Sequence, residues 1–240
     1  MRRLCFLLPL LGSIISASAA QAQYDEMIDV DEESHIESPE RFTVTLNLGM
    51  YQPDVGNDAF RQIFGDEQGP YVGGEVHGLI YRIPYVGLIG AGVGIGWADY
   101  DGRACGTTDD GSPDCDNRAD EKSSFTIYPL SFLASLRIDV LARELNIPLV
   151  FTPKIGLDAV FYRARTGSET DTSGVSIGLR WAVEFALELD FLERRAARAL
   201  DEEWGINHSF LFFQLFGSTA KTQLPVGDPL AWTAGLGFEF

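Results

Sequence analysis

Nine ionisable residues occupy polar positions in segments where apolar and polar residues alternate. They are Glu75, His77, Arg137, Lys154, Asp158, Arg180, Glu184, Glu188 and Glu239. On a strand such residues share one face, because successive side chains point to opposite faces. Buried charges are tolerated only when they are paired and hydrogen-bonded, so we expect this set to neutralise itself. The alternative is that these groups form a narrow path for ions or protons.

Histidines would most directly support acid–base or nucleophilic catalysis, and the sequence contains three. His35 lies in an acidic N-terminal segment, and His77 belongs to the alternating set. His208 and Ser209 are adjacent, so on a strand they would point to opposite faces and could not form a catalytic dyad. We therefore predict that the protein is not an enzyme and needs no cofactor. A lipid-modifying enzyme is the second alternative.

Two cysteines, Cys105 and Cys115, lie ten positions apart in a polar segment. A two-cysteine metal site there would lack a nearby histidine or further cysteine. In an exported chain the pair predicts a disulfide, which would restrict the unfolded chain by roughly 3 kcal/mol on the loop-entropy model.

The same polar segment is rich in acids, which offer the oxygen ligands that Ca²⁺ prefers. The weak metal candidates are Asp109, Asp110, Asp114 and Asp116. Their spacing lacks the order of a calcium loop, so we predict a solvated acidic loop and no metal. Bridging of divalent ions to lipopolysaccharide phosphates is a hypothesis without a motif.

Strict alternation of apolar and polar residues is the main structural signal of the sequence. It runs without interruption through 42–51 and 175–189, and it recurs at 71–82, 87–97, 123–137, 150–162, 207–216 and 230–240. Strands of soluble proteins average only about 5–6 residues. Long strands with one apolar and one polar face, in even number, are typical of barrels that face lipid. The sequence therefore predicts an all-β fold, an eight-stranded antiparallel transmembrane up-and-down β-barrel over 42–240.

The first 41 residues have a different character. Residues 1–22 predict a signal peptide, with Arg2 and Arg3, an apolar stretch over 4–15, and an A-x-A site at 20–22. The apolar stretch is too short to span a bilayer, which needs about 20 residues. Residues 23–41 carry eight acids and one base, and this composition predicts a disordered periplasmic leader.

The connections between the predicted strands fall into two groups. Those at 52–70, 98–122, 163–174 and 217–229 are long and polar, and we expect them outside the cell. On the periplasmic side, with both termini, we expect a tight turn near residue 84. Residues 138–147 and 190–204 predict two short periplasmic amphipathic helices.

Aromatic residues near strand ends predict the two interfacial girdles of a membrane barrel. The expected outer girdle is Tyr51, Tyr71, Trp97, Tyr100, Tyr162 and Trp232; the inner girdle is Phe42, Tyr81, Tyr85, Phe151, Phe191 and Phe240. The glycines of 87–97 would face inward and leave room for large neighbours such as Arg180, or for water.

The last strand ends in apolar residues at alternate positions. Trp232, Leu236, Phe238 and Phe240 resemble the terminal signal that the barrel-assembly machinery reads, which makes this machinery an expected partner. The stretch 42–240 also resembles a family of small outer-membrane β-barrel proteins described from myxobacterial genomes. The matching segments are NIPLVFTPKIGLDAVFY (146–162), ALELDFLERRAARALDEEWGINHSFLFFQL (186–215) and AWTAGLGFEF (231–240). The resemblance implies the fold and an outer-membrane location. It implies no catalytic residues, because that family has no assigned activity.

The formal charge of −17 argues against nucleic acid as a partner, because phosphates attract Lys and Arg. An eight-stranded barrel is just wide enough inside for its own side chains, so we predict a lumen plugged by paired charges. The expected protein is a monomer with a structural or surface-interaction role in the outer membrane. Its expected partners are outer-membrane lipids and lipopolysaccharide. The first alternative is a narrow ion or small-solute channel.

Overall fold

The computed structural model describes residues 41–55, 63–64, 69–103, 105–108, 113–118, 120, 122–166, 169–192 and 194–240. The chain divides into two units, Met1–Ile36 and Glu37–Phe240. The predicted signal peptide and nearly all of the predicted leader lie outside the described residues.

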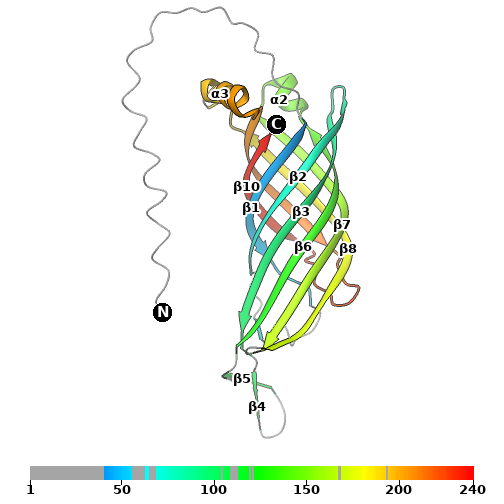
Figure 1. The fold of residues 1–240 in the computed structure, drawn as a ribbon, viewed down its shortest axis with the longest axis vertical. Helices are drawn as coiled ribbons and strands as arrows, with labels where there is room; N and C mark the ends of the chain where they lie inside the picture. The colour runs from blue at the N-terminus through cyan, green and yellow to red at the C-terminus, as the bar shows by residue number, and fades with distance from the viewer. Residues whose placement is uncertain are drawn as a thin grey trace, which may run out of the picture. The chain divides into compact units, whose positions relative to one another are not determined.

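Over the described residues, eight antiparallel strands close into a barrel (Figure 1). They are β1 (Phe42–Tyr51), β2 (Gly69–Ile83), β3 (Gly87–Gly102), β6 (Ser123–Ile138), β7 (Leu149–Thr166), β8 (Glu169–Glu188), β9 (His208–Ser218) and β10 (Ala231–Glu239). Barrel strands that follow one another in the chain are paired, and β1 pairs with β10 to close the sheet. The predicted up-and-down barrel is confirmed, and each predicted strand segment overlaps one of these strands.

The alternation in the sequence becomes an inside and an outside. On β1, Leu46 and Leu48 are about two-thirds exposed, whereas Thr45 and Asn47 are buried. On β8, Leu179 is exposed and its neighbour Arg180 is buried. Strand geometry alone produces this pattern, because each step along the chain reverses the side-chain direction. The result is a barrel with apolar residues outside and charged residues inside.

One end of the barrel carries α2 (Val140–Leu145), α3 (Arg194–Trp204) and the chain's last residue, and is called the helix end (Figure 1). Both helices were predicted, and each is shorter than its expected segment. Among the described residues, no helix is long and apolar enough to cross a membrane.

The opposite end, called the loop end, carries a small two-stranded hairpin (Figure 1). It is formed by β4 (Cys105–Thr107) and β5 (Pro113–Arg118), which sequence reasoning did not predict. The segment 219–229 also lies at this end. It follows the edge of β8, where the Leu179 N–H donates to Thr219 Oγ1 and the Ile177 N–H donates to Thr222 Oγ1.

Candidate functional site in the barrel lumen

A buried network of ion pairs joins opposite walls of the lumen. Lys154 Nζ on β7 lies 2.7 Å from Glu75 Oε2 on β2 and 2.7 Å from Glu184 Oε2 on β8. The same ammonium donates to Gln214 Oε1 on β9 at 2.9 Å, and Gln214 Nε2 donates to Glu75 Oε1 at 3.2 Å. An ammonium has three donors, and all three are used here. The sequence placed the three charged residues inside; the register brings them together.

His77 extends this network in a row that resembles a catalytic triad. Its Nδ1 lies 3.2 Å from Ser135 Oγ, and its Nε2 lies 3.2 Å from Glu75 Oε2. Serine hydrolases also place a histidine between a serine and an acid, although there Nε2 faces the serine. The adjoining lumen cavity measures about 10 Å³, which holds at most one water molecule. Ser135 is therefore enclosed, and no acyl substrate fits beside it.

Sequence reasoning considered His208 with Ser209, which are neighbours in the chain, and did not predict the contact between His77 and Ser135. The two residues that meet are 58 positions apart, on β2 and β6. The sequence shows that both residues occupy polar positions of their strands. It does not show that they are in contact, because the contact depends on strand register and on the geometry of the lumen.

Arg137 forms a second group of charges towards the helix end. Its Nη2 lies 2.6 Å from Glu239 Oε2 and 3.3 Å from Glu188 Oε1. The guanidinium also lies 5.2 Å from the ring centre of Phe210, at a distance that allows a cation–π contact. Arginine suits this position because its planar donors can satisfy two carboxylates while its face packs on a ring.

Arg180 and Asp158 form a third and looser pair. Arg180 Nη1 lies 3.8 Å from Asp158 Oδ2, and both side chains are fully buried. The guanidinium lies 4.1 Å from the ring centre of Phe216. All nine predicted inward residues therefore face the lumen or its helix-end mouth. They divide into three groups rather than one network.

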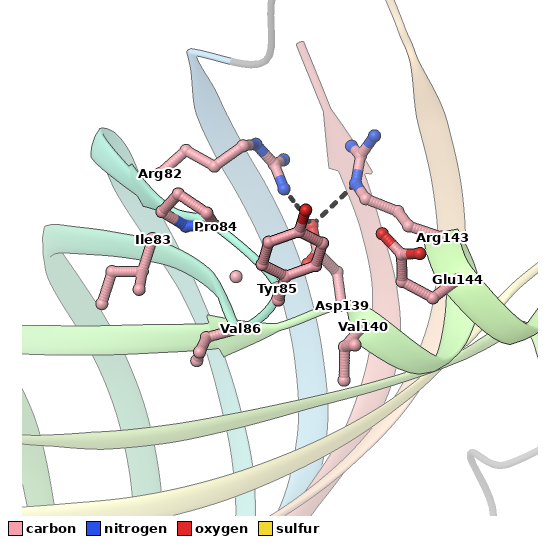
Figure 2. Close-up of a pocket in the computed structure, with 10 residues that line it drawn as sticks. Arg82, Ile83, Pro84, Tyr85, Val86, Asp139, Val140, Arg143 and Glu144 are labelled. Atoms are coloured by element: carbon pink, nitrogen blue, oxygen red, sulfur yellow. Dashed lines mark hydrogen bonds and ion pairs between the residues drawn. The ribbon is translucent and has the colours of Figure 1, made fainter.

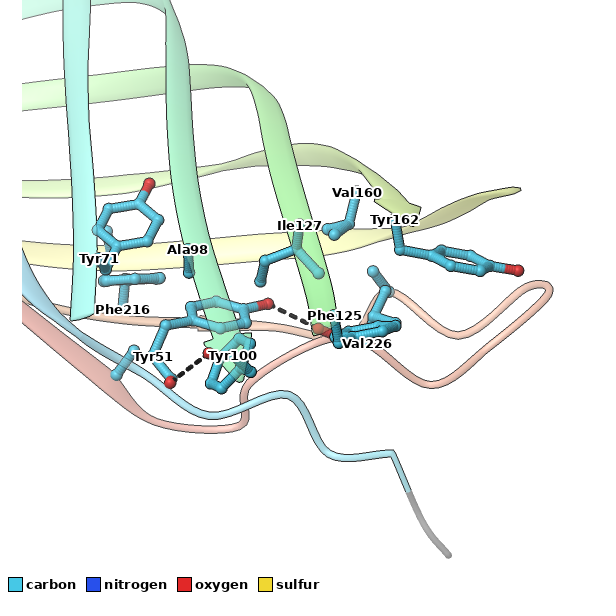
Figure 3. Close-up of a cluster of buried hydrophobic side chains, with 13 residues drawn as sticks. Tyr51, Tyr71, Ala98, Tyr100, Phe125, Ile127, Val160, Tyr162, Phe216 and Val226 are labelled. Carbon is cyan, nitrogen blue, oxygen red and sulfur yellow. Dashed lines mark hydrogen bonds between the residues drawn. The ribbon is translucent and has the colours of Figure 1, made fainter. Parts of the chain in front are cut away.

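A cluster of buried apolar side chains closes the lumen towards the loop end (Figure 3). Its large members are Tyr51, Tyr71, Tyr100, Phe125, Ile127, Val160, Tyr162, Phe216 and Val226. Tyr51 Oη donates to the Val226 carbonyl at 2.8 Å, and Tyr100 Oη donates to the Tyr51 carbonyl at 2.5 Å. Because Val226 belongs to the 219–229 segment, this segment forms part of the seal.

The same cluster corrects the predicted outer girdle. Tyr51, Tyr71, Tyr100 and Tyr162 are only 0–7% exposed and fill the lumen, whereas Trp97 and Trp232 are 42% and 39% exposed. The prediction used the height of each aromatic along its strand and ignored whether it stands at an inward position. At the helix end, four of the expected girdle residues are exposed (Phe42, Tyr81, Tyr85 and Phe191), and Phe151 and Phe240 are half-buried.

The glycines of β3 make room for bulky neighbours. A Cβ on Gly96 would lie 2.2 Å from the Tyr71 hydroxyl, and one on Gly92 would lie 2.5 Å from His77 Cγ. These two neighbours come from β2, whereas Gly90 and Gly94 lie against Ser135 and Ser131 of β6. Arg180, which the sequence suggested as an example, is not among them. Space left by these glycines is thus used to pack Tyr71 and His77 inside the barrel.

A pocket of about 320 Å³ lies outside the lumen, at the helix end (Figure 2). Asp139 is the N-cap residue of α2, but its side chain makes no capping bond; its Oδ2 instead accepts bonds from Arg82 Nη1 at 2.9 Å and Arg143 Nε at 2.8 Å. Arg82 belongs to β2 and Arg143 to α2, so one carboxylate ties the helix to the β2–β3 turn. Tyr85 at the tip of this turn has a φ of 62°, in the left-handed region that is rare for tyrosine.

The predicted disulfide and acidic loop are only partly described. The β4–β5 hairpin pairs Cys105 with Arg118 and Gly106 with Asp114, which sets the two cysteine-bearing strands side by side. The disulfide stays a prediction. Asp114 Oδ1 accepts the Asn117 N–H at 3.4 Å. Asp109, Asp110 and the side chain of Asp116 lie outside the described residues, as does the metal prediction that rests on them.

The predicted assembly residues lie on β10 and at the end of the chain. Trp232 and Leu236 are exposed on the outer face, and Phe238 and Phe240 are half-buried. The ring of Phe240 stacks on that of Phe42 with centres 4.7 Å apart. This contact lies where the first and last strands of the barrel, β1 and β10, are paired.

Comparison with known proteins finds similar solved structures only. No protein-family model matches the chain, and no curated protein matches it in sequence. The attachment invasion locus protein Ail of Yersinia pestis is 11% identical, with 85% of this chain and 100% of that chain covered and a TM-score of 0.41. Neisserial surface protein A is 12% identical, with coverages of 83% and 97% and a TM-score of 0.41. The N-terminal barrel domain of Pseudomonas aeruginosa OprF is 12% identical, with coverages of 84% and 100% and a TM-score of 0.37. Similarity this low transfers no property of these proteins to this chain.

Proposed function

We propose that the protein is a small outer-membrane β-barrel with a structural or surface-interaction role and a lumen sealed by its own side chains. The observation that carries the proposal is the inverted distribution of its residues. Ile80, Leu46, Ile95 and Ile155 are 64–71% exposed on the outer face, while the charged groups described above are inside. A soluble protein rarely exposes a large continuous apolar surface, whereas a barrel in lipid requires one.

The seal rests on successive groups of side chains along the lumen. Aromatic residues fill the loop end, the Lys154 network fills the middle, and Arg137 with its two carboxylates lies towards the helix end. An eight-stranded barrel has little width to spare, and these groups of side chains occupy it, so we expect no continuous water path. We therefore favour a plug over the narrow channel, and the enclosed Ser135 argues against a hydrolase.

The orientation follows from the unequal ends. We assign the helix end, with both termini of the barrel, to the periplasm and the loop end to the cell surface. Bacterial barrels usually have short periplasmic connections and longer outer ones. The tight β2–β3 turn at the helix end and the connections after β1, β3 and β9 at the loop end fit this arrangement. The long β8–β9 connection at the helix end does not fit it, and neither does the loop-end connection predicted at 163–174, because β7 ends at Thr166 and β8 begins at Glu169. The proposed partners are outer-membrane lipids, lipopolysaccharide and the barrel-assembly machinery. We also propose membership of the small barrel family described from myxobacterial genomes, and a monomeric state.

Two measurements test this proposal. The full chain, expressed in a Gram-negative host, is expected in the outer-membrane fraction and should migrate faster on a gel when unheated than when boiled. A mature chain that stays folded in buffer without detergent would contradict the membrane assignment. In planar bilayers the protein is expected to give no stable current, and a sustained open conductance would overturn the sealed lumen while leaving the location intact.

A further inference from the structure

Three side chains with metal-binding atoms converge at the helix end. Glu188 ends β8, Asp190 follows it, and His208 begins β9. One ligand atom from each lies within 4.8 Å of those of the other two. Sequence reasoning placed Glu188 inside and dismissed His208 as a catalytic residue. It did not consider Asp190.

The backbone holds these three residues in place. The Leu189 N–H donates to the Ser209 carbonyl at 2.8 Å, which joins β8 to β9 next to the cluster. The Ser209 N–H donates to Asp190 Oδ1 at 3.3 Å, which leaves Oδ2 to face His208 Nδ1 at 2.5 Å. Glu188 and His208 are thus positioned by their strands, and Asp190, in the turn after β8, is held by its contacts with the Ser209 N–H and His208.

The exposure of the three side chains suits an exchangeable ion. Glu188 is 14% exposed, His208 16% and Asp190 25%. They are covered enough to have fixed positions, yet all are open to solvent. A bound ion could enter from the helix end without crossing the sealed lumen.

The charges in contact around the site favour a cation. Glu188, Asp190 and Glu239 are acids, and Glu239 is the register partner of His208 on β10. Arg137 is the one base among the described groups that directly contact these acids, apart from His208 itself. When the His208 imidazole is neutral, the three carboxylates have only the Arg137 guanidinium to balance them, and the group carries a net negative charge. Partly buried carboxylates in excess need a compensating positive charge, which either a proton on His208 or a metal ion supplies.

The donor set selects the class of ion. One imidazole nitrogen with two carboxylate oxygens suits borderline ions such as Zn²⁺, whereas Ca²⁺ and Mg²⁺ prefer oxygen ligands alone. Three protein ligands also leave a fourth position for water. Bonds of about 2.0–2.2 Å would require Asp190 and His208 to separate by less than about 1 Å from their present contact.

From this geometry we propose that Glu188, Asp190 and His208 form a binding site for a divalent first-row transition ion, with Zn²⁺ as the representative ion. The site does not depend on the proposed membrane role. Its ion would link the end of β8 to the start of β9 at the mouth of the barrel.

The test uses the tag-free, oxidised full chain in detergent, with Zn²⁺ binding measured by calorimetry and Co²⁺ binding by absorption. Wild type should bind one Co²⁺ with a spectrum that lacks thiolate-to-metal bands, and Zn²⁺ should displace it while Ca²⁺ should not. The variants His208→Asn and Asp190→Asn should each lose at least about tenfold in Zn²⁺ affinity. His35→Asn, the same change in the N-terminal segment, should bind as wild type does.

A second readout covers variants that fold poorly. Zn²⁺ should raise the unfolding temperature of wild type and His35→Asn, and should leave that of His208→Asn and Asp190→Asn unchanged. The proposal is overturned if wild type binds no Zn²⁺, if His208→Asn binds it as tightly as wild type does, or if Ca²⁺ competes equally. If wild type binds no Zn²⁺, a protonated His208 alone balances the charge of the carboxylates at the site.

Discussion

Lys154 Nζ lies 2.7 Å from Glu75 Oε2, although the two residues are 79 positions apart. The contact exists because β2 and β7 lie on different sides of a closed sheet whose lumen is narrow enough for one long side chain to reach across. Glu184 shares the same ammonium at the same distance. A single cation therefore neutralises two carboxylates that the barrel has removed from water.

Removing that cation should be costly. In Lys154→Met, Glu75 and Glu184 would be buried without their main partner, and breaking a buried ion pair in this way costs about 3–5 kcal/mol. We expect a corresponding loss in the free energy of unfolding, measured by urea titration of the detergent-refolded barrel with the gel-mobility shift as readout.

A compensated variant provides the control for that experiment. Lys154→Met combined with Glu75→Gln and Glu184→Gln removes the uncompensated charge while keeping similar volumes. It should recover much of the lost stability, because neutral groups cost less to bury than lone charges. If the single and triple variants are equally unstable, Lys154 stabilises the barrel by packing rather than by charge.

Gly92 and Ala91 are adjacent residues of β3 on opposite faces of the barrel, so substitutions at the two positions test how closely the lumen is packed. A Cβ on Gly92 would lie 2.4 Å from the Val76 carbonyl oxygen and 2.5 Å from His77 Cγ, so Gly92→Ala should destabilise the barrel by about 1–3 kcal/mol. Ala91 is the adjacent residue and points to the outer face. Ala91→Gly should cost under about 1 kcal/mol. Equal effects in the same urea titration would contradict the packed lumen.

Much of the fold was predictable because it depends on period alone. The alternation in 42–51 and 175–189 shows which residues share a face. The observed β1 covers the first range, and β8 contains nearly all of the second but begins six residues earlier, at Glu169. Periodicity also placed Lys154 and Arg180 inside. These are local properties, which a single strand determines without knowledge of its partners.

What could not be predicted depends on register and on lumen geometry. The His77–Ser135 contact and the three-way contact of Lys154 need the relative heights of strands far apart in sequence. The position of Tyr51 inside the barrel was predictable in principle, because it stands in the polar phase of its strand. The girdle rule places Tyr51 at the outer rim because that rule considers the height of an aromatic residue along its strand and not the face on which it stands.

The 219–229 segment should respond to pH through Asp228. This buried carboxylate accepts the Gln52 N–H at 2.6 Å and the Leu230 N–H at 2.9 Å. Burial raises the pKa of Asp228 above its usual 3.8. An acid whose pKa is higher in the folded state adds stability that is full below 3.8 and is lost as pH rises through the folded pKa.

Amide hydrogen exchange of Gln52 and Leu230, corrected for intrinsic rates, measures this effect. Protection in wild type should decline as pH rises from about 4 towards neutrality. Asp228→Asn keeps one acceptor and should show protection that is flat with pH and greater than that of Asp228→Ala. A wild-type profile that matches Asp228→Asn at every pH would mean that Asp228 does not titrate in this range.

The hairpin at the loop end should be covalently closed. If Cys105 and Cys115 form the predicted disulfide, neither should react with a maleimide in the unreduced protein, and both should react after reduction. Cys105→Ser should leave Cys115 reactive from the start. Labelling of both thiols in the unreduced, detergent-folded wild type would refute the pairing.

The contact between Phe240 and Phe42 separates two roles of the terminal residue. Their rings stack with centres 4.7 Å apart, and the Phe240 N–H donates to the Phe42 carbonyl at 2.9 Å. Phe240→Ala and Phe42→Ala both remove the stack, so each should lower stability in detergent by roughly 0.5–1.5 kcal/mol beyond the loss of buried area.

Only Phe240→Ala would alter the terminal residue that we expect the assembly machinery to read. Quantification of heat-modifiable protein in the outer membrane of expressing cells should then show a larger deficit for Phe240→Ala than for Phe42→Ala. Equal deficits would mean that the stack, and not the terminal residue as a signal, accounts for assembly.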